Sequence, residues 1–163
     1  MLNVAPKHLC DVELLELIFD PPPIIRGTKD FRGYQHWMSN TIMAEPAVFL
    51  AAGMGLGKTA ASLWAAVRLL RKGRVKCVLI VAPLRVAENT WPEEIAAWDF
   101  ARSLEYTVVT GDEDQRKAAL AMGGEVHIVN RENLVWLQKY WGRRWPYDML
   151  IYDEASRLKS GSK

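Results

Sequence analysis

A glycine-rich turn between an apolar run and a helix-forming run constrains the fold of this chain more than any other feature. Residues 47–51, Ala-Val-Phe-Leu-Ala, predict a short buried strand, and residues 60–70, rich in Ala and Leu, predict a helix. Residues 52–59, Ala-Gly-Met-Gly-Leu-Gly-Lys-Thr, join the two. A strand that passes through such a turn into a helix is the context of a phosphate-binding loop (P-loop). The segment therefore predicts an α/β fold with a nucleoside-triphosphate site.

The residue types of this turn suit a triphosphate bound together with magnesium. Gly53, Gly55 and Gly57 let backbone amides face phosphate oxygens with no Cβ in the way, and the helix dipole adds positive potential. Lys58 is expected to meet the β- and γ-phosphates, and the Thr59 hydroxyl to bind Mg²⁺. Glycine-rich turns before helices also occur for packing alone, so the flanking strand and helix decide the interpretation.

An acidic pair near the end of the chain supplies the second half of the predicted site. Residues 148–152 form an apolar strand that leads into Asp153 and Glu154. Asp153 is expected to bind Mg²⁺ through water, and Glu154 to orient or polarise the attacking water. An Asp-Glu pair alone is common on protein surfaces, but an apolar strand before it, in a chain with a P-loop, favours the site.

Short apolar segments alternate with helix-forming segments along most of the chain. The predicted strands are residues 47–52, 77–82, 106–110, 126–129 and 148–152, and the predicted helices are residues 58–71, 90–98, 113–122 and 132–141. Uninterrupted apolar strands suit burial on both faces. The alternation predicts an open, mostly parallel α/β sheet with helices on both faces and ligands at the carboxyl ends of the strands.

Length and composition predict one intracellular domain. A chain of 163 residues supports one core, and a net charge of +2 neither indicates nor excludes a nucleic-acid partner. The two cysteines, Cys10 and Cys77, are far apart, which favours a buried free thiol at Cys77 over a disulfide or metal site. Apolar runs are too short to span a membrane. We expect a cytoplasmic protein without a membrane partner.

The proline run at residues 21–23 predicts a boundary. It ends the apolar stretch at residues 12–19 and forms a stiff, extended connector. Residues 1–30 are therefore expected to be an N-terminal appendage, and residues 31–163 the nucleotide-binding lobe.

Gln35 precedes the P-loop by about one helix and a turn and is a candidate adenine contact. Its carboxamide both donates and accepts, so it can pair with the Hoogsteen edge of adenine. A surface glutamine beside packed Tyr34 and Trp37 is the alternative.

Other conspicuous residues have structural explanations. The basic run at residues 71–76, Arg-Lys-Gly-Arg-Val-Lys, ends a predicted helix, so capping and solvation are its expected roles. Helix packing is the expected role of four tryptophans: Trp64, Trp91, Trp98 and Trp136.

Four sequence blocks resemble the first RecA-like lobe of superfamily-two helicases, and specifically the Swi/Snf-type double-strand DNA translocases. Ala at position 52, where the commonest P-loop has Gly, is typical of helicase-like motors, and Met-Gly-Leu at residues 54–56 is closer still to this family. The blocks are residues 31–35 (Q motif), 53–59 (motif I), 81–98 with 128–134 (motif Ia and the next DNA-facing loop), and 153–159 (motif II).

The resemblance implies ATP-driven translocation along duplex DNA, with ATP and Mg²⁺ as cofactors. It places Gln35 on adenine, Lys58 and Thr59 on phosphate and metal, Asp153 and Glu154 at metal and water, and Arg85 and Asn130 on DNA phosphates. Ser156 stands where the family usually has His or Gln. The chain ends soon after motif II, so we expect efficient ATP hydrolysis to require a second RecA-like lobe that these residues do not contain. From these residues alone we expect slow ATP turnover without DNA stimulation.

Two other interpretations remain open. The chain could be the motor lobe of a restriction or repair helicase, or a complete small protein that keeps a motor-lobe fold and acts by binding a protein partner. The closeness of the motifs to Met1 favours a phage or bacterial origin.

Overall fold

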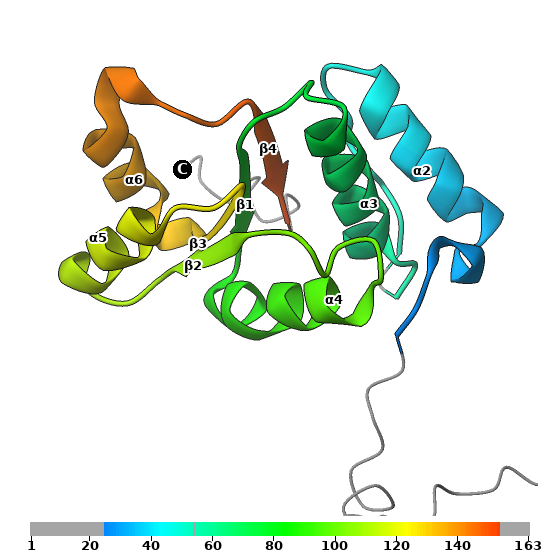
Figure 1. Cartoon of the computed structure of the whole chain (residues 1–163), viewed down its shortest axis with the longest axis horizontal. Coiled ribbons are helices and arrows are strands. Elements are labelled where there is room, and N and C mark those ends of the chain that lie inside the picture. The colour runs from blue at the N-terminus through cyan, green and yellow to red at the C-terminus, as the bar shows by residue number, and fades with distance from the viewer. Residues whose placement is uncertain (1–24, 54, 154–163) are drawn as a thin grey trace, which may run out of the picture.

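A four-stranded parallel sheet forms the centre of the computed structural model, which describes residues 25–53 and 55–153 (Figure 1). The strands are β1 (Val78–Ala82), β2 (Tyr106–Val109), β3 (Val126–Asn130) and β4 (Met149–Tyr152), in the order β2-β3-β1-β4. All pairs are parallel, with Val78 opposite Val126 on one side and Met149 on the other. The predicted open parallel sheet is therefore confirmed.

Helices cover both faces of this sheet, as predicted (Figure 1). Helices α3 (Lys58–Arg71) and α4 (Trp91–Ala97) pack on one face, and α2 (Gly33–Ala44) packs outside α3. Helices α5 (Glu113–Met122) and α6 (Leu134–Trp141) cover the other face. Short helical turns are Thr28–Asp30, Val86–Thr90, Arg131–Asn133 and Gly142–Arg144. In the described ranges, no helix is long and apolar enough to cross a membrane.

Strand β1 shows how the apolar pattern builds two cores. Successive side chains of a strand point to opposite faces, so an entirely apolar strand suits a sheet buried on both sides. Val78 and Ile80 join the cluster beneath α3 and α4, whereas Leu79 and Val81 join the cluster beneath α5 and α6. All four are 0% exposed.

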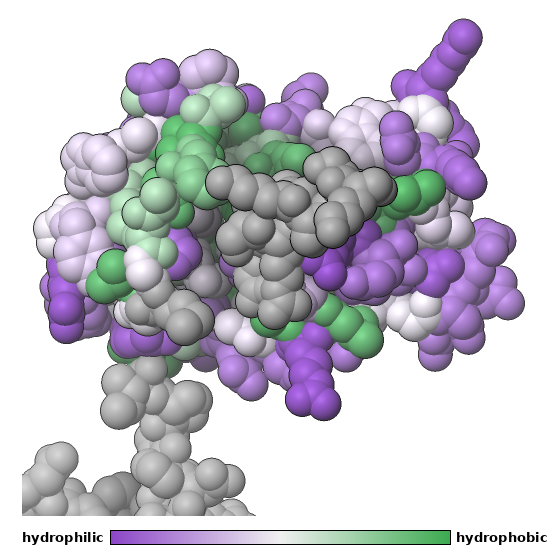
Figure 2. All heavy atoms as spheres, turned by 180° about the vertical axis from the view of Figure 1, so that it is seen from behind, coloured by the Kyte–Doolittle hydropathy of each residue, from purple (hydrophilic) through white to green (hydrophobic). Residues whose placement is uncertain are grey.

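Residues 47–52 do not form the strand that their composition predicts. The described residues give this segment no strand partner, and Phe49 is 73% exposed. The segment instead borders a groove of about 300 Å³ that it shares with Trp37, Met38 and Thr41 of α2. The prediction failed because a strand requires a neighbouring strand with which to exchange backbone hydrogen bonds, and the apolar composition of a segment does not provide one. The segment contributes to the apolar surface seen from behind (Figure 2).

The described part of the predicted appendage is attached to α4. The Arg26 amide donates to the Ala97 carbonyl at 2.8 Å, and the Asp99 amide donates to the Arg26 carbonyl at 2.9 Å. The Arg26 guanidinium also lies 4.5 Å from the ring centroid of Trp98. Residues 1–24 lie outside the described residues.

Candidate nucleotide site

The parallel register brings three predicted site segments to one edge of the sheet. Ala82 pairs with Asn130, and Val81 pairs with Tyr152, so β3, β1 and β4 end side by side. The Asp153 amide continues the ladder by donating to the Val81 carbonyl at 2.8 Å. Helix α3 begins at the same end of the molecule, so the P-loop lies near these carboxyl ends (Figure 1). This is the edge at which ligands of open α/β sheets bind.

Two glycines of the P-loop adopt a backbone conformation that is energetically unfavourable for residues with a side chain. Gly55 has φ +75° and Gly57 has φ +70°, both in the left-handed region. Gly57 is the N-cap of α3, and no side chain accepts a hydrogen bond at this cap. The first amides of α3 are therefore not covered by a capping side chain, and they lie at the positive end of the helix dipole.

Lys58 folds back over the loop. Its Nζ donates to the carbonyls of Ala52 and Gly53, each at 2.8 Å. Thr59 follows in the first helical turn and is half-buried. The ammonium group of Lys58 thus lies over the carbonyl oxygens at the start of the loop, beside the amino end of α3.

Gln35 packs against the turn. It is 8% exposed, and its Oε1 accepts a hydrogen bond from the Arg32 amide at 2.9 Å. A Cβ added at Gly57 would overlap the Gln35 Nε2. The alternative of an exposed surface glutamine is therefore wrong, because the carboxamide lies at the entrance to α3.

Asp153 is linked to the core by a residue to which sequence reasoning assigned packing alone. Trp91 is 1% exposed, and its Nε1 donates to Asp153 Oδ2 at 3.2 Å. A buried indole N–H needs an acceptor, and this was the sequence signal that Trp91 would reach a polar group. The other tryptophans assigned to packing, Trp64, Trp98 and Trp136, also contact core clusters.

Magnesium would find few protein ligands among the described residues. In residues 25–53 and 55–153, no group of three or more His, Cys, Asp or Glu side chains gathers to hold a metal. Mg²⁺ is commonly held by one or two carboxylates together with substrate phosphates and water, so this does not conflict with Thr59 and Asp153 as ligands. Glu154 and Ser156 lie outside the described residues.

The two predicted DNA-contacting residues differ in their surroundings. Arg85 is exposed beyond the end of β1. Asn130 is 7% exposed; its Nδ2 donates to Glu132 at 3.0 Å and its Oδ1 accepts from Asn133 at 2.5 Å. The Asn130 side chain therefore organises the turn after β3. The backbone amide of Glu132, together with the hydrogen bond from Asn130, holds the pKa of the Glu132 carboxyl below its ordinary value.

Comparison with known proteins agrees with this architecture. The family model of the SNF2-related domain matches residues 33–163. Protein p41 of Acyrthosiphon pisum secondary endosymbiont phage 1 is 43% identical over 131 residues, which cover 79% of this chain and 28% of p41. A protein of Arabidopsis thaliana named "Probable ATP-dependent DNA helicase" is 30% identical, over 89% of this chain and 14% of that protein.

A solved structure shares the fold. The Sulfolobus solfataricus SWI2/SNF2 ATPase core in complex with dsDNA superposes with a TM-score of 0.65 at 24% identity, over 86% of this chain and 29% of that one. The chain thus spans less than a third of the length of each of these relatives. Because the family model covers most of the residues, the chain belongs to the SNF2-related domain family.

Proposed function

We propose that this chain is the ATP-binding lobe of an ATP-dependent motor that moves along double-stranded DNA. The observation that supports this most is the convergence of Lys58, the uncapped start of α3 and Asp153 at one end of the sheet. Relatives named as helicases, and a shared fold with an ATPase core solved with dsDNA, favour this function over other P-loop chemistries.

The loop fits the phosphates of a nucleotide. The amides at the start of α3 have no side-chain acceptor, so phosphate oxygens would supply the acceptors that they lack. The ammonium of Lys58 would exchange the carbonyls of Ala52 and Gly53 for the β- and γ-phosphates. The positive φ of Gly57 would keep the turn open to the phosphates.

The magnesium ion would supply charge neutralisation at the phosphates, and Thr59 and Asp153 would hold it. The hydrogen bond from Trp91 orients the Asp153 carboxylate, which would face the metal or its water shell. Glu154 would orient the attacking water.

Gln35 would recognise adenine through its amide nitrogen. The Arg32 amide donates to the carbonyl oxygen Oε1 and so orients the carboxamide, and the Nε2 donor would meet the base. Adenine N7 accepts such a bond. Arg85 would contact a DNA phosphate, and Asn130 would position the neighbouring loop.

Binding of Mg-ATP to the purified chain tests this function. We expect calorimetry to show weak binding that Lys58→Ala abolishes, because the ammonium that would meet the phosphates is lost. Lys29→Ala, which removes an exposed lysine elsewhere, is the matched control and should bind as the parent chain does. Equal ATP affinity in the Lys58→Ala and parent chains would contradict the proposal.

A further inference from the structure

A short segment before α2 lies across the end of α4. The Arg26 amide donates to the Ala97 carbonyl at 2.8 Å, and the Asp99 amide donates to the Arg26 carbonyl at 2.9 Å, so Arg26 forms a parallel bridge with Trp98. We name residues 25–31 the N-terminal strap. The strap precedes residues 33–163, which the family model matches.

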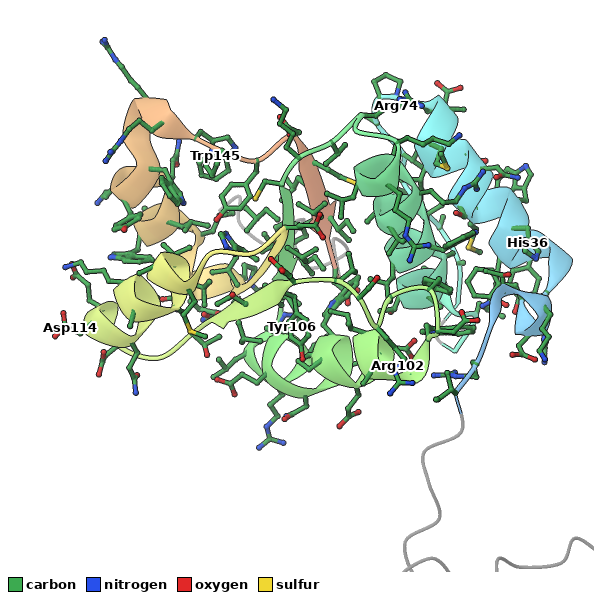
Figure 3. The ribbon with its side chains drawn as sticks, viewed as in Figure 1. His36, Arg74, Arg102, Tyr106, Asp114 and Trp145 are labelled. Carbon is green, nitrogen blue, oxygen red and sulfur yellow. The ribbon has the colours of Figure 1, made fainter. Side chains whose placement is uncertain are left out.

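Side chains also hold the strap to α4. The Arg26 guanidinium lies 4.5 Å from the ring centroid of Trp98 and 3.7 Å from Glu94 Oε1. The other carboxylate oxygen of Glu94 accepts a hydrogen bond from Trp98 Nε1 at 2.6 Å. Because Trp98 is 3% exposed, the cation lies on a ring that the core holds in place. Figure 3 shows the strap (blue) passing the connection that carries Arg102 and continuing to α2, which carries His36.

Phe31 fixes the other end of the strap among aromatic rings. It is 8% exposed, and its ring lies edge-on to Trp98 at 4.9 Å and to Phe100 at 5.9 Å. Phe100 in turn contacts Trp64 of α3 at 4.7 Å. Edge-to-face aromatic pairs favour particular ring orientations, so this packing holds Phe31 in a defined place between α4 and α3.

The two ends of the strap are joined by a hydrogen-bonded turn. The Gly27 amide donates to Asp30 Oδ2 at 2.7 Å, and the Asp30 amide donates to the Gly27 carbonyl at 2.9 Å. The Phe31 amide donates to the Thr28 carbonyl at 3.1 Å. A displacement at Arg26 would therefore be passed on to Phe31, because the turn between them is closed.

The strap leads directly into the first turn of α2, which carries Gln35. Phe31 precedes Arg32, the N-cap of α2, and the Arg32 amide donates to Gln35 Oε1 at 2.9 Å. The Gln35 carboxamide lies where a Cβ on Gly57 would be. The position of the start of α2 therefore determines where the carboxamide meets the P-loop.

We propose that the N-terminal strap positions the Gln35 carboxamide for adenine, with Arg26 and Phe31 as its positioning residues. Both residues would act through the start of α2 and not by touching the nucleotide. A donor that is already held in place loses less conformational entropy when the base binds, so its hydrogen bond contributes more affinity. The choice of adenine as the ligand rests on the proposed function, whereas the placement of Gln35 can be measured without nucleotide.

The first test measures that placement by NMR spectroscopy of the purified chain without nucleotide. Arg26→Ala removes a half-exposed side chain, and Phe31→Leu keeps an apolar side chain but loses the ring contacts. Each should shift the resonances of the Gln35 carboxamide and the Gly57 amide. Arg102→Ala, which removes an exposed arginine from the connection after α4, is the matched control and should leave both resonances in place. Parent-like resonances in both strap variants would overturn the proposal.

The second test measures base selectivity, by competition of Mg-ATP and Mg-GTP against a fluorescent nucleotide. In Arg26→Ala, the ratio of ATP affinity to GTP affinity should fall by about twofold to fivefold, the range that corresponds to one exposed cation–π contact. The affinity for GTP should not change, because the strap does not contact the phosphate-binding turn. Arg26→Lys keeps a cation over Trp98 and should retain the ratio of the parent chain.

A control for general instability separates positioning from folding. Asp112→Ala removes the N-cap of α5, on the other face of the sheet, and should lower stability without changing the ratio. A parent-like ratio in both Arg26→Ala and Phe31→Leu, in a chain whose ATP binding requires Lys58, would overturn this inference alone. Equal ATP affinity in Lys58→Ala and the parent chain would contradict the proposed function, and the resonances of Gln35 and Gly57 would still decide whether the strap positions them.

Discussion

At the scale of single residues, position 57 of the turn favours glycine for two reasons. Gly57 has a positive φ, and the Gln35 carboxamide fills the space that a side chain would occupy. Gly55 has a similar φ, but a Cβ there would meet nothing within 4 Å. The two glycines therefore separate the effect of backbone conformation from the effect of close packing.

We expect Gly57→Ala to destabilise the fold more than Gly55→Ala. The left-handed conformation costs an alanine about 1–2 kcal/mol at either position. Overlap with Gln35 adds about 1–3 kcal/mol at Gly57 alone. Urea denaturation of both variants measures the difference. Gln35→Ala combined with Gly57→Ala should recover part of the loss, and equal destabilisation by the two single substitutions would contradict this account.

The sequence was sufficient to identify the residues of the loop, but it did not predict the hydrogen bond between Trp91 and Asp153. Glycine spacing and the following helix predicted where Lys58 would lie. The hydrogen bond from Trp91 to Asp153 joins residues 62 positions apart in the chain, and no periodic pattern encodes a pair so distant. Long-range polar contacts of this kind depend on tertiary packing, which the sequence specifies only collectively.

At the scale of elements, the helices follow local signals closely. Helix α5 occupies Glu113–Met122, as predicted. Its start is fixed by a reciprocal capping box: Asp112 Oδ1 accepts from the Gln115 amide at 2.9 Å, and Gln115 Oε1 accepts from the Asp112 amide at 2.8 Å. Local hydrogen bonds such as these are readable from sequence, whereas the missing strand at residues 47–52 depended on a distant partner.

Asp112→Ala should destabilise the protein by about 1 kcal/mol, because the N-cap acceptor of α5 is lost. Asp114→Ala is the control. It removes a first-turn carboxylate that interacts with the helix dipole but is not the cap, so its cost should stay at about 0.3 kcal/mol. Chemical denaturation distinguishes the two. A loss in Asp114→Ala as large as that in Asp112→Ala would show that charge, not capping, fixes this end.

At the scale of the whole molecule, a buried histidine makes global stability depend on pH. His127 lies in β3 at 5% exposure, and its Nδ1 is 2.8 Å from the Tyr147 hydroxyl. Burial lowers the pKa of His127 below its ordinary value of 6.5, although the Gly123 carbonyl opposes this. The folded state thus favours the neutral imidazole, and the unfolded state takes up a proton first as the pH falls.

The contribution of His127 to the free energy of unfolding should therefore be constant at pH values above the ordinary histidine pKa. The free energy of unfolding should decrease as the pH falls below about 6.5. His127→Gln, which does not titrate, should show a shallower decrease over the same range. Urea denaturation at several pH values between about 5 and 8 measures both curves. Parallel curves for the two proteins would exclude His127 as the source of the dependence.

The contact between Trp91 and Asp153 has a consequence for substitutions in the core. The indole belongs to the core beneath α4, while the carboxylate that it holds belongs to the proposed metal site. Substitutions that repack this core shift the indole, and with it the orientation of a metal ligand, without touching the nucleotide. Stability of the fold and affinity for the proposed metal are therefore expected to depend on the same core residues. A substitution in this core could therefore alter the proposed metal site while every motif residue stays the same.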